Sequence, residues 1–224
     1  MHKAVLIKTY KTLPAYDRRE ILRYAGARGD ESGEVQALLD ECLAECDGAF
    51  TPRVCYVTLT RAEFFEIFPQ SETAKTWTDG CANITVFAAT VGIEIDRLIH
   101  RYSSVATAKA LLFQAIGAER IERLCDVFCN EFCNGFCAEQ KEKNKCAQKR
   151  FSPGYGDFPL TAQKEMFALL NPSKHIGVTL TESFLMSPTK SVTAAFGIKD
   201  GGGIEKVQKN CAVCGKEDCS FKRE

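Results

Sequence analysis

The chain has 224 residues, enough to bury a core without disulfides, and we expect one domain over 1–204 with a separate tail over 205–224. Lys plus Arg and Asp plus Glu number 29 each, so no net field attracts nucleic acid or an anionic membrane, and neither is an expected partner. The apolar run after Met1 is too short for a signal peptide, and no stretch is long enough to span a bilayer. We therefore expect a cytoplasmic protein whose twelve cysteines are mostly reduced thiols.

The first fifty residues predict helices. Apolar residues keep helical spacing over much of 15–48, and the segment 25–33 is a polar link between two helices. Asp17 stands where a side chain caps the first of them, because its carboxylate can accept a hydrogen bond from a free backbone N–H of the first turn. We expect two short helices here.

Strands and a long helix follow. Branched and aromatic residues predict strands at 54–59 and 83–88, while 63–68 between them fits a helix or a strand. After Gly92 the apolar spacing becomes helical and is predicted to stop near Gly117, because glycine commonly ends helices.

The second half mixes both kinds of element. A second long helix is predicted over about 118–141, and a short one over 162–170 that Asn171-Pro172 ends. Strands are predicted at 176–180 and 191–198. Helices and strands do not alternate regularly, so we predict an α+β fold rather than a wound parallel sheet.

The segment from Arg150 to Pro159 is the candidate site. Two Gly, two Pro and three aromatic residues exclude regular structure, and the arginine offers a planar fork for a carboxylate or phosphate. Gly154 lets a ligand approach the backbone, and Tyr155 offers a ring with a polar tip. This set suits a small anionic or zwitterionic ligand; the alternative is an ordinary Pro/Gly turn that carries a surface arginine.

A ligand that carries an amine or a sulfonium also needs a carboxylate partner, because a buried unpaired cation is costly. Glu182 is expected at a strand end, where side chains often face a cleft. Glu122 and Asp126 are one helical turn apart. For each of the three, the alternative is a solvated surface acid.

Cysteines fall at four-residue steps along the second long helix, at Cys125, Cys129, Cys133 and Cys137. They share a face, but twelve residues of helix rise about 18 Å, so four thiols cannot meet one metal unless the helix breaks, for instance at Gly135. We favour packing of buried free thiols over metal ligation.

The tail holds a different set. Cys211 and Cys214 form a C-x2-C pair and Cys219 follows, a spacing that can bind one ion. With a fourth ligand from elsewhere in the chain, the tail could hold zinc or an iron–sulfur cluster. The alternative is a thiol-bearing tail without metal.

At this point the sequence resembles a known family. Arg150-Phe151-Ser152-Pro153-Gly154-Tyr155, and then Leu180-Thr181-Glu182-Ser183-Phe184 at the right distance, resemble the activation domain of cobalamin (vitamin B12)-dependent methionine synthase. The resemblance covers most of 80–198, and it implies long helices packed on a curved, mainly antiparallel sheet. In that family the domain binds S-adenosylmethionine and presents it to the cobalamin of a partner domain. The methyl group, with an electron from a flavodoxin-like donor, converts oxidised cob(II)alamin back to methylcobalamin.

The resemblance also implies roles for residues. Arg150 would meet the ligand's carboxylate, the backbone around Ser152 and Gly154 would hold the adenosine, and Tyr155 would border the pocket. Glu122 matches a helix acid of the family's site.

The chain departs from the family in three respects. No substrate, folate or cobalamin domain is recognisable, so we expect a protein that acts in trans on a cobalamin-binding methionine synthase subunit or another corrinoid protein. Gly156-Asp157-Phe158-Pro159-Leu160-Thr161 stands where the family has P-A-C-P-x-H, so the histidine position is Thr161. The cysteine tail replaces the family's aromatic tail.

Two rival hypotheses remain. One is a metal or iron–sulfur redox protein that partners a corrinoid protein, and the other is a non-catalytic chaperone of a corrinoid protein.

Overall fold

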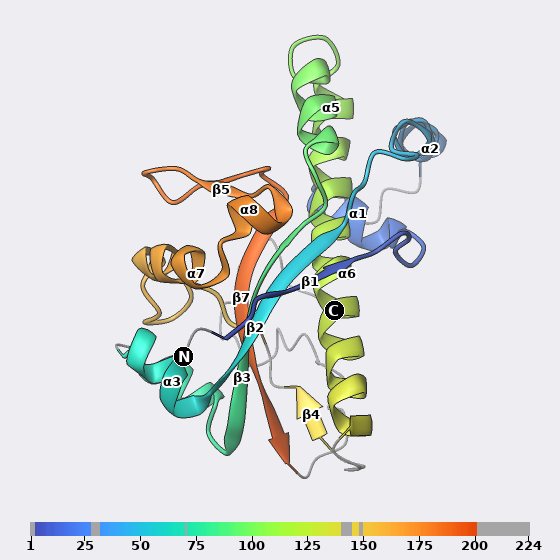
Figure 1. Cartoon of the computed structure of the whole chain (residues 1–224). Helices are drawn as coiled ribbons and strands as arrows, with labels where there is room; N and C mark the ends of the chain where they lie inside the picture. Colours follow the sequence, from blue (N-terminus) through green and yellow to red (C-terminus); the bar gives the residue numbers. More distant parts are fainter. Residues whose placement is uncertain (1–2, 28–31, 70, 140–144, 148–149, 201–224) are drawn as a thin grey trace.

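The central element is an antiparallel sheet. The computed structural model describes residues 3–27, 32–69, 71–139, 145–147 and 150–200. Five strands pair in the spatial order β1-β2-β3-β7-β4, and every pair is antiparallel (Figure 1). The strands are β1 (Leu6–Thr9), β2 (Arg53–Thr60), β3 (Cys81–Thr90), β7 (Ser191–Asp200) and β4 (Lys145–Ala147). The predicted α+β class and the mainly antiparallel sheet are confirmed.

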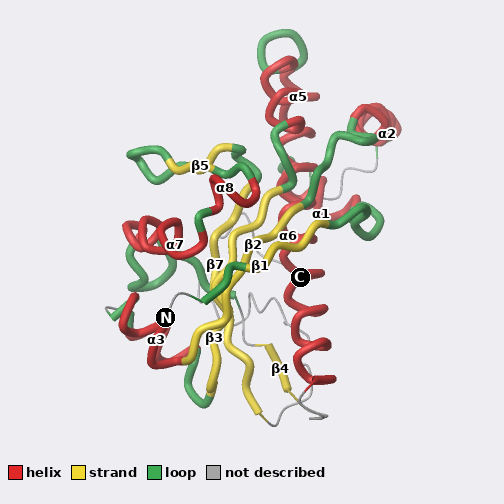
Figure 2. Tube along the Cα trace, in the orientation of Figure 1, coloured by secondary structure: helices red, strands yellow, loops and turns green. Residues whose placement is uncertain are grey.

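Both faces of the sheet are buried under apolar cores. Since successive side chains of a strand point to opposite faces, neighbouring residues of one strand lie in different cores. In β7, Ala194 and Phe196 lie in one apolar core, whereas Ala195 lies in the other. Neighbouring β3 behaves likewise, with Phe87 in the first core and Val86 in the second. Helices cover both faces, so the molecule has three layers (Figure 2).

The two helical layers differ in size. The first core lies under the layer that contains the three longest helices, among which α6 runs along the whole sheet (Figure 1). The second core lies under short helices that follow the strands and the candidate loop. The first layer comprises α1 (Arg18–Tyr24), α2 (Gly33–Glu45), α5 (Glu94–Tyr102) and α6 (Thr107–Glu139). The second layer comprises α3 (Arg61–Ile67), α4 (Glu72–Trp77), α7 (Gln163–Leu170) and α8 (Pro172–Ile176). No helix of the described chain combines the length and apolarity that crossing a membrane requires.

Helix caps confirm one prediction and settle an open one. Asp17 caps α1, because its carboxylate accepts a hydrogen bond from Glu20 N at 3.1 Å. The ambiguous segment 63–68 is helical. Thr60 and Glu63 form a capping box in which each side chain accepts from the other's backbone N–H, and this starts α3 directly after β2.

The predicted boundary between the two long helices was wrong. The chain turns at residues 103–106, and α6 then runs unbroken through Gly117 and Gly135 to Glu139. Gly117 serves close packing: a Cβ at this position would lie 2.9 Å from Lys190 Cγ and 3.1 Å from Ile95 Cγ1. The predicted stop was inferred from a glycine that the helix needs for contact with its neighbours.

The strand predicted at 176–180 is also largely wrong. Asn171 ends α7 in the left-handed conformation, as predicted for that stop, but Pro172 starts the further short helix α8 up to Ile176. Proline favours the first helical position, since its missing N–H would have no partner there. Only β5 (Thr179–Leu180) is extended, and it pairs with β6 (Met186–Ser187) in a hairpin.

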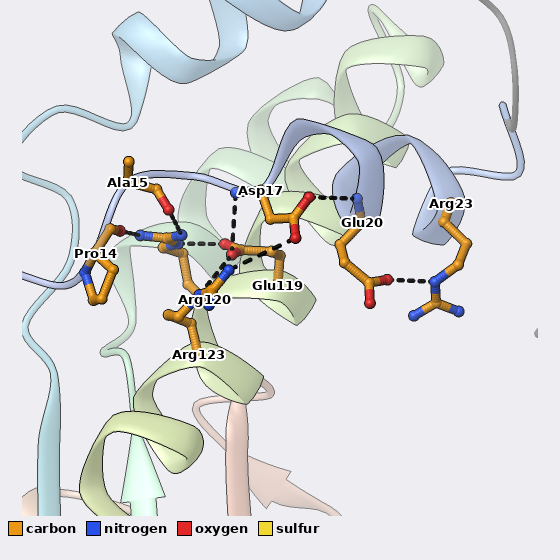
Figure 3. A network of polar contacts seen from close by, with 8 residues as sticks. All are labelled: Pro14, Ala15, Asp17, Glu20, Arg23, Glu119, Arg120 and Arg123. Carbon is orange, nitrogen blue, oxygen red and sulfur yellow. Dashed lines mark hydrogen bonds and ion pairs between the residues drawn. The ribbon is translucent and has the colours of Figure 1, made fainter. Parts of the chain in front are cut away.

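A buried ionic network joins the start of the chain to α6 (Figure 3). Glu119 and Arg120 are each 3% exposed, and their side chains form an ion pair. Arg120 also donates to the carbonyl oxygens of Pro14 at 2.7 Å and Ala15 at 3.3 Å, while Glu119 accepts from Asp17 N at 3.3 Å. The network therefore fixes the segment before α1 against the helix that carries the candidate acids.

Candidate functional site

The site begins where the chain passes along the outer edge of β7. β4 pairs with the end of β7, and Phe151 then forms a bridge with Ala195, with N–O distances of 2.9 and 2.8 Å. Phe151 is buried in the second core, where its ring contacts Phe64 and Trp77. Arg150, the residue before it, reaches α6 in the first layer instead. Two consecutive residues at this edge of the sheet therefore contact the two helical layers, Arg150 the first and Phe151 the second.

Arg150 is held by two carboxylates. Its guanidinium donates to Asp126 Oδ1 at 2.6 Å and to Glu122 Oε2 at 3.0 Å. The two acids are one turn apart on α6, so they face the arginine together. The arginine side chain is 22% exposed, whereas those of Glu122 and Asp126 are 49% and 41% exposed. The cluster is thus open to solvent on its acidic side, and it places a cation and two anions within reach of one small ligand.

Thiols lie beneath this cluster. Cys125 and Cys129 are buried, and burial raises the pKa of the Cys129 thiol to about 11 although the Arg150 guanidinium opposes this shift. Burial likewise raises the pKa of Cys125 well above its usual value. Both thiols are therefore neutral near pH 7. Cys125, Cys129 and Cys133 are buried in the first core, which confirms packing for these three; the side chain of Cys137 lies outside the described part of the structure.

The loop after Phe151 is a tight turn. Gly154 has a φ of +94°, a backbone conformation that favours glycine. Its N–H donates to the carbonyl oxygen of Phe158 at 2.8 Å, and the N–H of Tyr155 donates to that of Ser152 at 3.2 Å. Tyr155 is 65% exposed, so the apex of the turn faces solvent. The predicted irregular loop is confirmed, and it presents backbone at the positions expected to hold a ligand.

Glu182 lies apart from the arginine. It is exposed in the turn of the β5–β6 hairpin, just beyond the strand end where it was expected, and no described hydrogen bond or ion pair joins it to Arg150. The hairpin lies beside the helix that follows the loop, since Lys164 Nζ of α7 is 5.3 Å from the ring centroid of Phe184. Of the predicted residues, the structure brings together Arg150 and Glu122, with Ser152, Gly154 and Tyr155 following directly in the chain.

Two acids of this region were not among the predicted site residues. Asp126 was named beside Glu122 as a possible carboxylate partner of the ligand, and Asp157 only as a departure from the family pattern. Both are bound by groups distant in the chain, Asp126 by Arg150 and Asp157 by the start of α4. The only available signal was the one-turn spacing of Asp126 from Glu122.

The predicted metal ligands Cys211, Cys214 and Cys219 lie outside the described residues. Within the described chain, no three His, Cys, Asp or Glu side chains converge as a metal site requires. Zinc or an iron–sulfur cluster in the tail stays a prediction.

Comparison with known proteins places these features in a family. No curated protein matches the chain. Among solved structures, the fold is similar to the crystal structure of the MetH reactivation domain bound to AdoHcy, with a TM-score of 0.53 and 17% sequence identity over 88% of this chain and 78% of that one. A family model, vitamin B12-dependent methionine synthase, activation domain, matches residues 73–201, more than half of the chain. The resemblance predicted from the loop and the hairpin is confirmed, and the chain belongs to the family of vitamin B12-dependent methionine synthase activation domains.

Proposed function

We propose that this protein binds S-adenosylmethionine at Arg150 and Glu122 and along the backbone of Ser152, Gly154 and Tyr155, and that it supports reactivation of a cobalamin-dependent methionine synthase in trans. The observation that carries the proposal is the arginine clamped by two half-exposed acids at the start of a solvent-facing loop. The AdoHcy named with the similar structure belongs to the same ligand class.

The ligand's chemistry fits this cluster. S-adenosylmethionine carries a carboxylate, an ammonium and a sulfonium, so it needs one cation and at least one anion from the protein. Arg150 would bind the carboxylate through its planar fork, and Glu122 and Asp126 would then bind the ammonium. Because each acid is already within hydrogen-bond distance of Arg150, the three charged groups lie close together before the ligand arrives.

The adenosine would lie on the loop. Gly154 exposes backbone without a side chain in the way, and the ring of Tyr155 is accessible to stack or to border the purine. Glu182, on the hairpin beside α7, would face the sulfonium end of the ligand from the opposite side. The protein's task is orientation, since a sulfonium is an inherently good leaving group.

Cobalamin would be held by the partner, where its cobalt accepts the methyl group after one-electron reduction by a flavodoxin-like donor. The residues of this chain would hold the methyl group toward that partner and supply no acid or base. We propose as partner a cobalamin-binding methionine synthase subunit or another corrinoid protein.

The test is calorimetric titration of S-adenosylmethionine into the full chain and into Arg150→Ala, Glu122→Gln and Glu182→Ala. We expect the Arg150 variant to weaken binding at least about tenfold, because the ligand's carboxylate loses its only described cationic partner within this cluster. No heat and no shift in melting temperature at millimolar ligand, with or without a corrinoid protein present, would refute the proposal. Loss in the Glu182 variant alone would move the site to the hairpin.

A further inference from the structure

The candidate loop is tied at its far end to a helix on the second face. The carboxylate of Asp157 accepts hydrogen bonds from Ser71 Oγ at 2.8 Å, from Glu72 N at 2.8 Å and from Thr73 N at 3.1 Å. Ser71 in turn caps α4, accepting from Ala74 N at 2.9 Å. Two free N–H groups at the start of α4 are therefore satisfied by a residue 84 and 85 positions away in the chain.

These contacts strongly favour the ionised carboxylate. Hydrogen bonds from Thr73 and Ser71 lower the pKa of Asp157 to about 2. The anchor is thus charged at every physiological pH, and its bonds to backbone N–H groups are of the stronger, charge-assisted kind.

The backbone approaches α4 closely at the same place. Gly156 has a φ of +57°, and a Cβ added there would lie 2.8 Å from Thr73 Oγ1. Two residues further on, the ring of Phe158 is buried, and its centroid lies 5.7 Å from the ring centroids of both Phe68 and Phe151. With the Phe151 bridge at its start and Asp157 near its end, the loop is held at both ends while Tyr155 at its apex faces solvent.

We infer that Asp157 is the positioning residue of the ligand loop: by binding Ser71, Glu72 and Thr73, its carboxylate holds the backbone of Ser152, Gly154 and Tyr155 in the conformation that receives adenosine. This rests on the proposed function for the identity of the ligand. Preforming the loop stabilises the complex, because less conformational entropy is lost on binding.

The experiment compares Asp157→Ala and Asp157→Asn with Thr60→Ala in the full chain. Thr60→Ala removes a helix cap of similar kind from α3 in the same layer, and among the described hydrogen bonds the side chain of Thr60 bonds only within its own capping box. For each protein, calorimetry gives the Kd for S-adenosylhomocysteine and for methylthioadenosine, which lacks the amino acid group. Thermal melting gives stability, and hydrogen exchange gives the protection of the amides of Gly154 and Phe158.

We expect Asp157→Ala to weaken both ligands by a similar factor, about tenfold, and to lower protection of the two loop amides. Asp157→Asn keeps one acceptor oxygen, so it should retain part of the ligand affinity and part of the protection of the loop amides. Thr60→Ala should lower the melting temperature without changing either Kd. By contrast, Arg150→Ala should weaken S-adenosylhomocysteine far more than methylthioadenosine, because only the former carries a carboxylate.

The inference is overturned if Asp157→Ala leaves Kd and loop protection at wild-type values, or if Thr60→Ala weakens the ligands equally, since the effect would then be one of general stability. Should the wild-type protein bind neither ligand, the proposed function fails, and the exchange data alone decide on the anchor: unchanged protection in Asp157→Ala refutes it, and lost protection supports it.

Discussion

The buried ion pair of Glu119 and Arg120 shows how much a single buried residue can contribute to the free energy of unfolding. Replacing Glu119 by alanine removes the acid that pairs with buried Arg120 and accepts from Asp17 N. An uncompensated buried charge typically costs several kcal/mol, so we expect the free energy of unfolding to fall by about 3 kcal/mol. Urea denaturation measures this. Glu94→Ala is the control, because its ion pair with Arg97 is exposed and should matter by less than about 0.5 kcal/mol; equal losses in the two variants would contradict the expectation.

Asp157 should titrate at unusually low pH. The pKa of Asp157 in the folded protein is about 2, below its ordinary value. The ionised carboxylate therefore contributes its full stabilisation of the fold above the pKa of the unfolded chain, and this stabilisation is lost as the pH falls through the folded-state pKa. We expect the NMR shift of the Gly154 amide to stay constant from pH 7 to about pH 4 and to change toward pH 2. The same shift in Asp157→Asn should not follow this transition. A midpoint near pH 4 in the wild-type protein would mean that the carboxylate is not bound as described.

At this scale the sequence predicts some residues and not others. Arg150 could be named as a candidate because a guanidinium in a short irregular segment with Gly and Pro suits an anionic ligand, and its role in ligand binding stays a prediction. Asp157 could not, because its partners are brought to it only by the fold. The same holds for Arg120, whose carbonyl partners Pro14 and Ala15 lie just before α1 and more than a hundred residues earlier in the chain than Arg120 itself.

Two glycines of α6 should respond differently to substitution by alanine. At Gly135 an added Cβ meets nothing within 4 Å, so Gly135→Ala should raise the free energy of unfolding by about 0.5–1 kcal/mol through helix propensity. At Gly117 the Cβ would press on Lys190 and Ile95, so Gly117→Ala should stabilise less or destabilise. Denaturant melts of the two variants give the comparison, and a larger gain at Gly117 would contradict it.

Elements were predicted best where local signals and packing agree. The strands at β2 and β3 could be read from branched residues, and α1 from its cap, because these signals lie within a few residues. The length of α6 could not be predicted, because the sequence does not distinguish a glycine that ends a helix from a glycine that allows close packing of a neighbouring element. The five-strand order likewise depends on contacts between distant segments, such as β3 with β7.

For the whole molecule, metal binding by the tail tests the metal-binding rival of the proposed function. If the rival holds, the anaerobically purified protein carries zinc or iron bound by Cys211, Cys214 and Cys219, and Cys214→Ser loses it. Elemental analysis beside the absorption spectrum measures both. A metal-free wild-type protein with unimpaired S-adenosylmethionine binding would remove the rival. If deletion of 205–224 leaves cobalamin reactivation unchanged, a redox role for the tail is excluded.

Because Arg150 is already paired with Glu122 and Asp126, ligand binding would exchange ion-pair partners rather than create new ion pairs. Each contact that the ligand makes replaces one within the protein, so the number of close ion pairs changes little. The chain is also neutral overall, with 29 basic and 29 acidic residues, and exerts no long-range attraction. We therefore expect Kd for S-adenosylmethionine to vary less than about twofold when NaCl rises from about 50 to about 500 mM, as calorimetry can measure. A steep loss of affinity with salt would mean that the ligand meets an arginine free of its acids.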